Sequence, residues 1–411
     1  MSSSKSFSIL GKGLKANSAA DLEPYLSELR EMEDVEEVHF GANSLGVEAC
    51  LAIAEVLKGK KNLKLVDLAD VFTGRLISEI PQALSAMCDA LKDHTSLVEL
   101  DLSDNAFGGR CADAMVPFLE TNTHFQNFRL NNNGLGPIGG KIIAHALSAN
   151  ADKCAKEGKE SSLRVIICGR NRLENGSAGN WAKAFEKHGK LREVRMIQNG
   201  IRMEGIEAIA KGLAKCPTLE VLDLQDNTAT LSGTRALVKV LPTWKDLRIL
   251  NLSDCILSPA GGIALGTALS SGSNPKLEEL RLQYGEFDKR TVELLSTAIT
   301  QHLTQLRVLE LNGNKFDAED ECVEKLREAL ALHGHEDALD ELEDMEEADE
   351  DEDEEEDEED EAEKSDEDAE EAADEDDGVA KGEDSSVLPP VSDKATDDLA
   401  DLLAGSHIAS K

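Results

Sequence analysis

The sequence is poor in the features that mark membrane, secreted and nucleic-acid-binding proteins. No apolar run reaches membrane-spanning length, and the N-terminal residues lack the apolar segment of a secretory signal. The eight cysteines form no CxxC pair, which favours free buried thiols in a reducing compartment over disulfides or a zinc site. The body of the chain carries no excess of positive charge. We therefore expect a cytoplasmic protein with no membrane and no nucleic-acid partner.

Catalytic and nucleotide-binding motifs are missing as well. The segment 134–141 resembles a phosphate-binding loop, but Leu135 stands where that loop needs its first glycine, and Ile142 stands where it needs Ser or Thr. The sequence contains neither GxSxG nor HExxH, and His333 and His335 have no cysteine partners for a metal site. We predict a binding protein that is not itself an enzyme and that holds no metal or cofactor.

Acidic residues are concentrated near the C-terminus. Residues 336–378 contain 31 Asp or Glu and one Lys, whereas residues 1–335 carry a net charge of only −6. A segment of this composition cannot bury enough apolar surface to offset its chain entropy. We therefore expect a folded domain over residues 1–335, a disordered acidic segment over residues 336–378, and an extension over residues 379–411. In that extension a short amphipathic helix is expected around Leu399, Leu402 and Leu403.

The folded part is built from an internal repeat, which is clearest in residues 125–136, FQNFRLNNNGLG. Its apolar and asparagine positions match the leucine-rich-repeat pattern LxxLxLxxNxLG, which forms one strand and one turn. Aligned on position 9 of this pattern, eleven units follow one another, most of them about 28 residues long, and a helical pattern follows the turns. This length predicts an α/β fold, a leucine-rich-repeat solenoid of the ribonuclease-inhibitor-like horseshoe type.

Two asparagines at the turn of this unit have different expected roles. Asn133, at position 9, should bond backbone groups that the bend leaves unpaired. Asn132, at position 8, is not needed for that task and should point from the rim of the concave face. Arg170 and Asp226 occupy position 8 in later units. A solvated surface is the simplest interpretation of most such positions, and a protein-binding surface is the functional one.

One unit departs from the repeat. Val71 replaces the expected asparagine, and the next four residues leave the consensus: Phe72, Thr73, Gly74 and Arg75. A local departure from the pattern of a fold often marks a site. Gly74 is able to adopt a backbone conformation that presents Arg75 outward.

A binding protein with these residues can still promote chemistry in a partner. A GTPase is accelerated when another protein inserts an arginine into its site or positions its own glutamine. From the residues alone, Arg75 is the candidate for the inserted arginine and Asn132 is the candidate for the positioning role.

Several motifs in the chain resemble the Ran GTPase-activating proteins, most closely their fungal members. The matching stretches cover nearly all of residues 7–332, and they include DVFTGR with EIPQAL (70–84), LSDNAFG (102–108), LNNNGLGP (130–137), ICGRNRLENGS (167–177) and LRLQYGE (280–286). The stretch CGRNRLENGS is not required by the repeat, so its match is specific. The acidic segment that follows the last repeat matches the family too.

This resemblance implies an activator of GTP hydrolysis by Ran in its GTP form, in the service of nucleocytoplasmic transport. GTP and Mg would be bound by the GTPase, and a Ran-binding protein is a further candidate partner. In the family an asparagine at the position of Asn132 orients the catalytic glutamine of the GTPase. The arginine matching Arg75 supports the interface and does not act as an arginine finger. We expect a monomer, with partner-binding residues Asn131, Phe72, Thr73, Arg170 and Asp226.

A second interpretation comes from a different functional class. Leucine-rich repeats followed by an acidic tail also describe the acidic leucine-rich nuclear proteins, which are non-catalytic chaperones of histones and other basic proteins. That family has fewer and shorter repeats than the eleven units near 28 residues found here. The length and number of the repeats therefore favour the GTPase activator.

Overall fold

The computed structural model describes residues 5–346. Within this range, eleven three-residue strands pair in parallel and in sequence order to form one sheet. They are β1 (Ser6–Ser8), β3 (Glu37–His39), β5 (Leu65–Asp67), β6 (Glu99–Asp101), β7 (Asn127–Arg129), β8 (Val165–Ile167), β9 (Glu193–Arg195), β10 (Val221–Asp223), β11 (Ile249–Asn251), β12 (Glu279–Arg281) and β13 (Val308–Glu310). Two shorter strands, β2 (Lys15–Ala16) and β4 (Ser44–Leu45), pair with each other beside this sheet.

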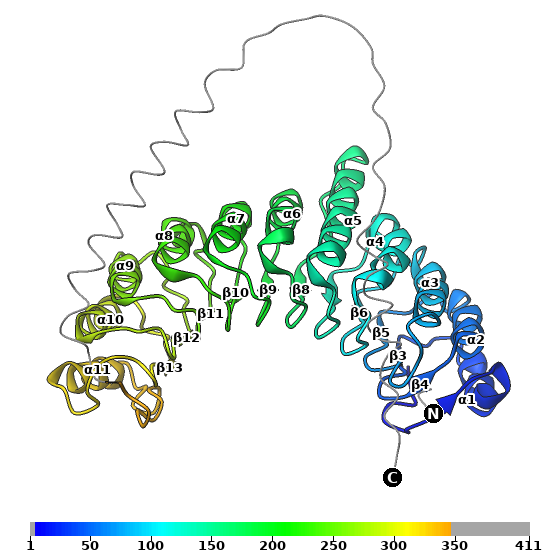
Figure 1. The fold of residues 1–411 in the computed structure, drawn as a ribbon, viewed down its shortest axis with the longest axis horizontal. Coiled ribbons are helices and arrows are strands. Elements are labelled where there is room, and N and C mark those ends of the chain that lie inside the picture. The colour runs from blue at the N-terminus through cyan, green and yellow to red at the C-terminus, as the bar shows by residue number, and fades with distance from the viewer. Residues whose placement is uncertain (1–4, 347–411) are drawn as a thin grey trace, which may run out of the picture. The chain divides into compact units, whose positions relative to one another are not determined.

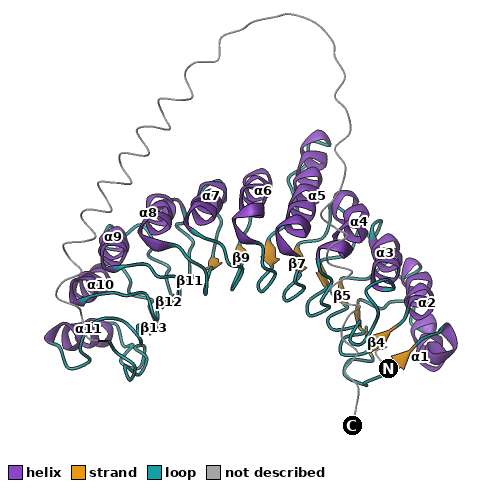
Figure 2. Ribbon diagram, in the orientation of Figure 1, coloured by secondary structure: helices purple, strands orange, loops and turns teal. Residues whose placement is uncertain are grey.

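A helical segment follows nearly every strand of the large sheet. The strands line the inner side of a curved array and the helices line its outer side (Figures 1 and 2). The predicted α/β leucine-rich-repeat solenoid is confirmed. The helices are α1 (Ala19–Glu31), α2 (Val47–Lys58), α3 (Ile80–Leu91), α4 (Val116–Thr121), α5 (Gly136–Lys156), α6 (Glu174–His188), α7 (Met203–Leu213), α8 (Thr230–Val240), α9 (Pro259–Leu269), α10 (Lys289–Gln301) and α11 (Glu321–Ala331), with 3₁₀ turns η1 (Gly109–Met115) and η2 (Leu241–Thr243).

The core lies between the strand layer and the helix layer. The middle residue of each strand points into it, so Phe128 of β7 is buried together with Ile143 and Leu147 of α5. Burial of each such side chain contributes about 1.5–3 kcal/mol to folding. All eight cysteines are buried and unpaired, as predicted. No helix among residues 5–346 is both long enough and apolar enough to cross a membrane.

A ladder of buried asparagines holds the turns together. In the central unit, Nδ2 of Asn133 donates to the carbonyl oxygens of Leu102, Leu130 and Asn131, at 3.0, 3.2 and 2.9 Å. Its Oδ1 accepts the N–H of Asn105 in the preceding unit at 3.0 Å. The side chain therefore satisfies backbone groups of two neighbouring units, which confirms the structural role predicted for Asn133.

The end of the folded domain requires a correction to the predicted boundary at residue 335. Leu309 of β13 donates its N–H to the carbonyl of Ala338 at 2.8 Å and accepts the N–H of Asp340 at 3.0 Å. The Asp340 carboxylate accepts the N–H groups of Leu311 and Asn312 at 2.8 and 3.1 Å. The first residues of the acidic segment thus close the last repeat, and the folded domain includes Glu346, whose N–H donates to the carbonyl of Asn314 at 2.9 Å. The disorder predicted for the rest of that segment, and the helix predicted within residues 379–411, lie outside the described residues.

Candidate functional site

The rim of the solenoid is a column of residues that share one unusual backbone conformation. From the second unit to the last, the residue at position 8 has a positive φ, which bends the chain sharply at the end of each strand. Asn and Asp tolerate this left-handed region better than most side chains because their short polar groups bond locally. The column comprises Ala42, Asp70, Asp104, Asn132, Arg170, Gln198, Asp226, Asp254, Tyr284 and Gly313, with φ between 50° and 75°.

Asn132 is held in place at the centre of this column while its side chain stays exposed. Its backbone N–H donates to the carbonyl of Gly169 at 2.9 Å, and its φ is 53°. Its Nδ2 donates to Oδ1 of Asp104 at 2.9 Å. Within residues 5–346, no hydrogen bond reaches the Oδ1 of Asn132. The structure therefore presents an oriented amide whose oxygen is available to a partner.

Two other predicted rim residues, Arg170 and Asp226, are also exposed and have positive φ values of 55°. In the described part of the chain, neither side chain is engaged in a hydrogen bond or ion pair. Asn131 lies in a different environment. Its Oδ1 accepts the N–H of Gly169 at 2.6 Å and the residue is half-buried, so its amide joins two repeats.

Arg75 lies two repeats before Asn132, and no hydrogen bond joins the two residues in the described structure. The φ of Gly74 is +74°, as its predicted role requires, but Arg75 turns back onto the N-terminal repeats. Its Nη1 donates to Oδ1 of Asn17 at 2.6 Å, and its Nη2 donates to the carbonyls of Ala16 and Ser44 at 2.9 and 2.6 Å. The guanidinium thus ties β2 to β4, and the outward presentation expected from the sequence is not seen.

The burial of Phe72 requires a second correction. Phe72 was predicted to contact a partner, but it is only 4% exposed and its ring lies 6.1 Å from that of Phe107 in the next unit. Val71 beside it is buried as well, and its N–H still joins the ladder by donating to Oδ1 of Asn105 at 2.8 Å. The unit loses its asparagine but keeps an apolar turn, so of the two residues predicted here to contact a partner, Phe72 and Thr73, only Thr73 is exposed.

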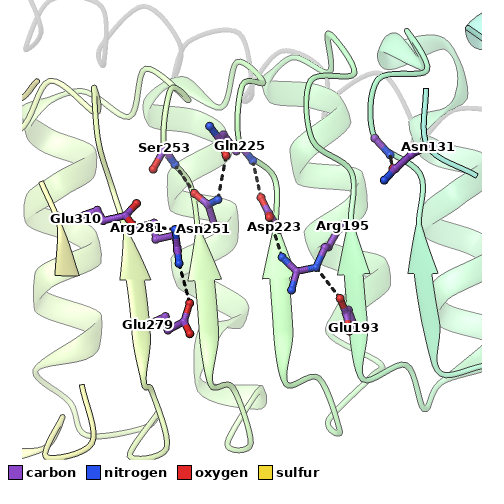
Figure 3. A network of polar contacts seen from close by, with 11 residues as sticks. Asn131, Glu193, Arg195, Asp223, Gln225, Asn251, Ser253, Glu279, Arg281 and Glu310 are labelled. Atoms are coloured by element: carbon purple, nitrogen blue, oxygen red, sulfur yellow. Dashed lines mark hydrogen bonds and ion pairs between the residues drawn. The ribbon is translucent and has the colours of Figure 1, made fainter. Parts of the chain in front are cut away.

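The concave face differs from the rim because its charges are paired with one another. Arg195 contacts Glu193 at 2.5 Å and Asp223 at 3.1 Å. Figure 3 shows this cluster beside a second one, in which Arg281 lies between Glu279 and Glu310, at 3.0 and 2.8 Å. Burial raises the pKa of Asp223, although Arg195 and a backbone N–H oppose the shift.

These internal pairs leave the concave face of β9–β13 with few free groups, so the central rim is the better candidate site. Within residues 5–346, no group of three or more His, Cys, Asp or Glu side chains is placed to hold a metal ion.

Known proteins with similar sequences decide the family. The leucine-rich-repeat family model matches residues 93–115 and 245–266. Ran GTPase-activating protein 1 of Saccharomyces cerevisiae is 35% identical over 330 residues, which cover 78% of this chain and 81% of that protein. The chain belongs to the Ran GTPase-activating protein family.

Animal members of the Ran GTPase-activating protein family match shorter stretches. Ran GTPase-activating protein 1 of Xenopus laevis is 47% identical over 197 residues, which cover 47% of this chain and 34% of that protein. Ran GTPase-activating protein 2 of Caenorhabditis elegans is 39% identical over 208 residues, covering 50% of this chain and 22% of its own length. The chain therefore corresponds to about a third or less of these two animal proteins.

Proposed function

We propose that this chain stimulates GTP hydrolysis by Ran in its GTP form, and that Asn132 orients the catalytic glutamine of the GTPase. The proposal is supported by the relatives, which carry the name Ran GTPase-activating protein. The observation that carries the mechanism is the amide of Asn132, which is exposed, fixed at its nitrogen and open at its oxygen.

The chemistry requires positioning more than it requires a new charge. A GTPase alone is slow because its attacking water is loosely oriented and the developing charge is poorly stabilised. An amide oxygen that accepts a hydrogen bond from the NH₂ group of the glutamine would leave the glutamine oxygen to orient that water. GTP and Mg belong to the GTPase in this scheme, and the chain acts without a cofactor and without being an enzyme itself.

The environment of Arg75 supports a mechanism without an arginine finger. Its guanidinium donates to three acceptors in β2, β4 and the loop after β2. Inserting it into a GTPase would break three hydrogen bonds of a charged group, and each such bond contributes about 1.5–3 kcal/mol. We therefore assign Arg75 to the support of the N-terminal rim, and Thr73, Arg170 and Asp226 to partner contact.

The test is single-turnover GTP hydrolysis by Ran with saturating amounts of this chain or of its Asn132→Ala variant. Loss of the positioning amide should slow the stimulated rate by about 10²-fold, because a displacement near 1 Å in a reacting group already costs that much. Ala42 occupies the same rim position with a φ of 54°, so alanine fits this backbone.

Gln198→Ala is the matched control, because Gln198 is an exposed rim amide two units away with a φ of 51°. This control should retain the saturated rate. If Asn132→Ala abolishes binding of Ran-GTP instead of slowing hydrolysis, Asn132 is an anchor and the positioning mechanism is wrong. If the unaltered chain does not accelerate hydrolysis at all, the alternative of a non-catalytic acidic chaperone is the next one to test with basic proteins.

The cellular role follows from the same proposal. A protein that converts Ran-GTP to Ran-GDP in the cytoplasm would support nucleocytoplasmic transport, and we propose that location and role for this chain. We expect it to act as a monomer, with a Ran-binding protein as a further partner. Sedimentation measures these assemblies directly for three samples: the chain alone, the chain with Ran-GTP, and the chain with Ran-GTP and a Ran-binding protein.

A further inference from the structure

The amide of Asn132 has one hydrogen-bonding neighbour on the rim, Asp104. The two residues are 28 positions apart, lie at position 8 of adjacent units, and have φ values of 53° and 63°. The distance between Nδ2 of Asn132 and Oδ1 of Asp104 is 2.9 Å. In the described part of the rim column, no other two neighbouring position-8 residues are joined by a side-chain hydrogen bond. This contact is therefore not a general property of the repeat.

We propose that Asp104 is a positioning residue that fixes which end of the Asn132 amide faces the partner, an inference that rests on the proposed function. The final torsion of an asparagine side chain is broad and nearly two-fold, so an isolated amide presents its oxygen and its nitrogen about equally. A carboxylate has only acceptors. Asp104 therefore binds the NH₂ end and leaves the oxygen end for the glutamine of the GTPase.

The backbone keeps this pair in register. The N–H of Asp104 donates to the carbonyl of Asn131 at 2.9 Å, and the N–H of Asn132 donates to the carbonyl of Gly169 at 2.9 Å. The backbone bends at Asp104 and at Asn132 are thus each bonded to the following repeat. The carboxylate and the amide therefore meet on two fixed backbones, and no long side chain has to be ordered to bring them together. A short acceptor on a fixed backbone is well suited to select one amide orientation.

The experiment uses the full-length chain carrying Asp104→Gly, assayed by GTP hydrolysis with Ran over a range of concentrations. Glycine removes the acceptor without backbone strain, because Gly313 occupies the same rim position with a φ of 75°. Without the carboxylate the amide loses its anchor as well as its preferred orientation, whereas a free choice between two anchored orientations would cost only about twofold. We therefore expect the saturated rate to fall about tenfold, with little change in the concentration for half-maximal rate.

Two further variants separate orientation from other roles. Asp104→Asn keeps an acceptor oxygen but also offers a donor, so both orientations of Asn132 become available and the rate should fall only about twofold. Asp254→Gly removes an acidic rim residue of the same conformation, with a φ of 55°, and should leave the saturated rate unchanged.

The decisive measurement is Asp104→Gly in the Asn132→Ala background. If Asp104 acts through Asn132, the second substitution has no further effect on the rate, since coupled residues are not additive. An equal loss in both backgrounds overturns the inference, as does a variant whose half-maximal concentration rises while its saturated rate is unchanged. If the full-length wild-type chain does not accelerate hydrolysis, the proposed function itself is wrong. This result is distinct from a failure of the role proposed for Asp104.

Discussion

The asparagine ladder makes a quantitative prediction about stability, because its members have unequal numbers of exclusive partners. Oδ1 of Asn227 accepts two N–H groups, those of Asn199 and Ile201, at 3.2 and 3.0 Å. Its Nδ2 donates to the carbonyl of Met196 at 3.0 Å. None of these three backbone groups has another hydrogen-bond partner in the described structure. Substitution of Asn227 by alanine therefore leaves three buried groups unpaired.

The side chain of Asn133 makes four hydrogen bonds, but most of its partners have a second hydrogen bond of their own. The carbonyl of Leu102 also accepts a bond from Asn105, the ladder asparagine of the preceding unit, and that of Leu130 also accepts one from the next ladder asparagine, Asn171. The carbonyl of Asn131 also accepts the N–H of Asp104. Only the N–H of Asn105 would lose its sole acceptor.

Each unpaired buried group costs about 1–3 kcal/mol. We therefore expect Asn133→Ala to lower the free energy of unfolding by about 1–3 kcal/mol, and Asn227→Ala, which leaves three groups unpaired, to lower it by about 3–9 kcal/mol.

Urea unfolding of the two variants and the wild type, followed by circular dichroism, measures this difference. Because solenoids can open locally, native-state hydrogen exchange should be measured together with urea unfolding. The backbone amides of Asn199 and Ile201 should exchange faster in the Asn227→Ala variant than in the wild type. Asn62→Ala is the control, since Asn62 is exposed and makes one side-chain bond, to Asp34. If Asn227→Ala destabilises the chain no more than Asn133→Ala does, the loss of stability does not follow the number of buried backbone groups left unpaired.

Two further predictions concern the pH dependence of stability and the end of the domain. Burial lowers the pKa of His188 to about 4, below its ordinary value of 6.5, so the unfolded chain binds a proton that the folded chain does not. The free energy of unfolding should therefore not depend on this group above about pH 6.5, and should fall by about 3 kcal/mol toward pH 4. Urea unfolding at pH 7.5 and at pH 5 measures this loss of stability, and the His188→Gln variant should lack the part of it that His188 causes. A chain ending at residue 335 loses the contacts of Asp340 and should melt several degrees below one ending at residue 348. Equal melting temperatures would show that residues 336–346, the closing segment, add no stability.

The sequence predicted the repeat and the rim well because both depend on local periodicity. A strand, an asparagine and a left-handed bend recur at fixed spacing, so Asn132 could be placed on the rim and Asn133 in the ladder without coordinates. The same register also contains the signal for Asp104, which occupies the rim position one unit earlier. Its significance was missed because a hydrogen bond between neighbouring units depends on distances that a one-dimensional pattern does not contain.

Three features could not be predicted from local rules. Phe72 leaves the consensus, yet it is buried because Phe107 in the next unit offers an apolar surface. Arg75 turns inward because strands β2 and β4, which no repeat pattern predicts, present acceptors to it. Composition placed residues 336–346 with the acidic segment, whereas Leu339, Leu342 and Met345 pack against the core. In each case a distant contact outweighs a local preference.

The closing segment has a consequence for the assembly of the protein. A parallel sheet of stacked repeats has no intrinsic stopping point, because its final strand displays the same unpaired backbone groups that join every earlier pair. An open edge of this kind is a template for another strand, from a second copy or from an unfolded chain. Here Ala338 and Asp340 occupy the backbone groups of Leu309, and the carboxylate of Asp340 places a negative charge beside the same edge. The segment therefore terminates the solenoid in the way a capping subunit terminates a filament, and chains that lack it should associate end to end.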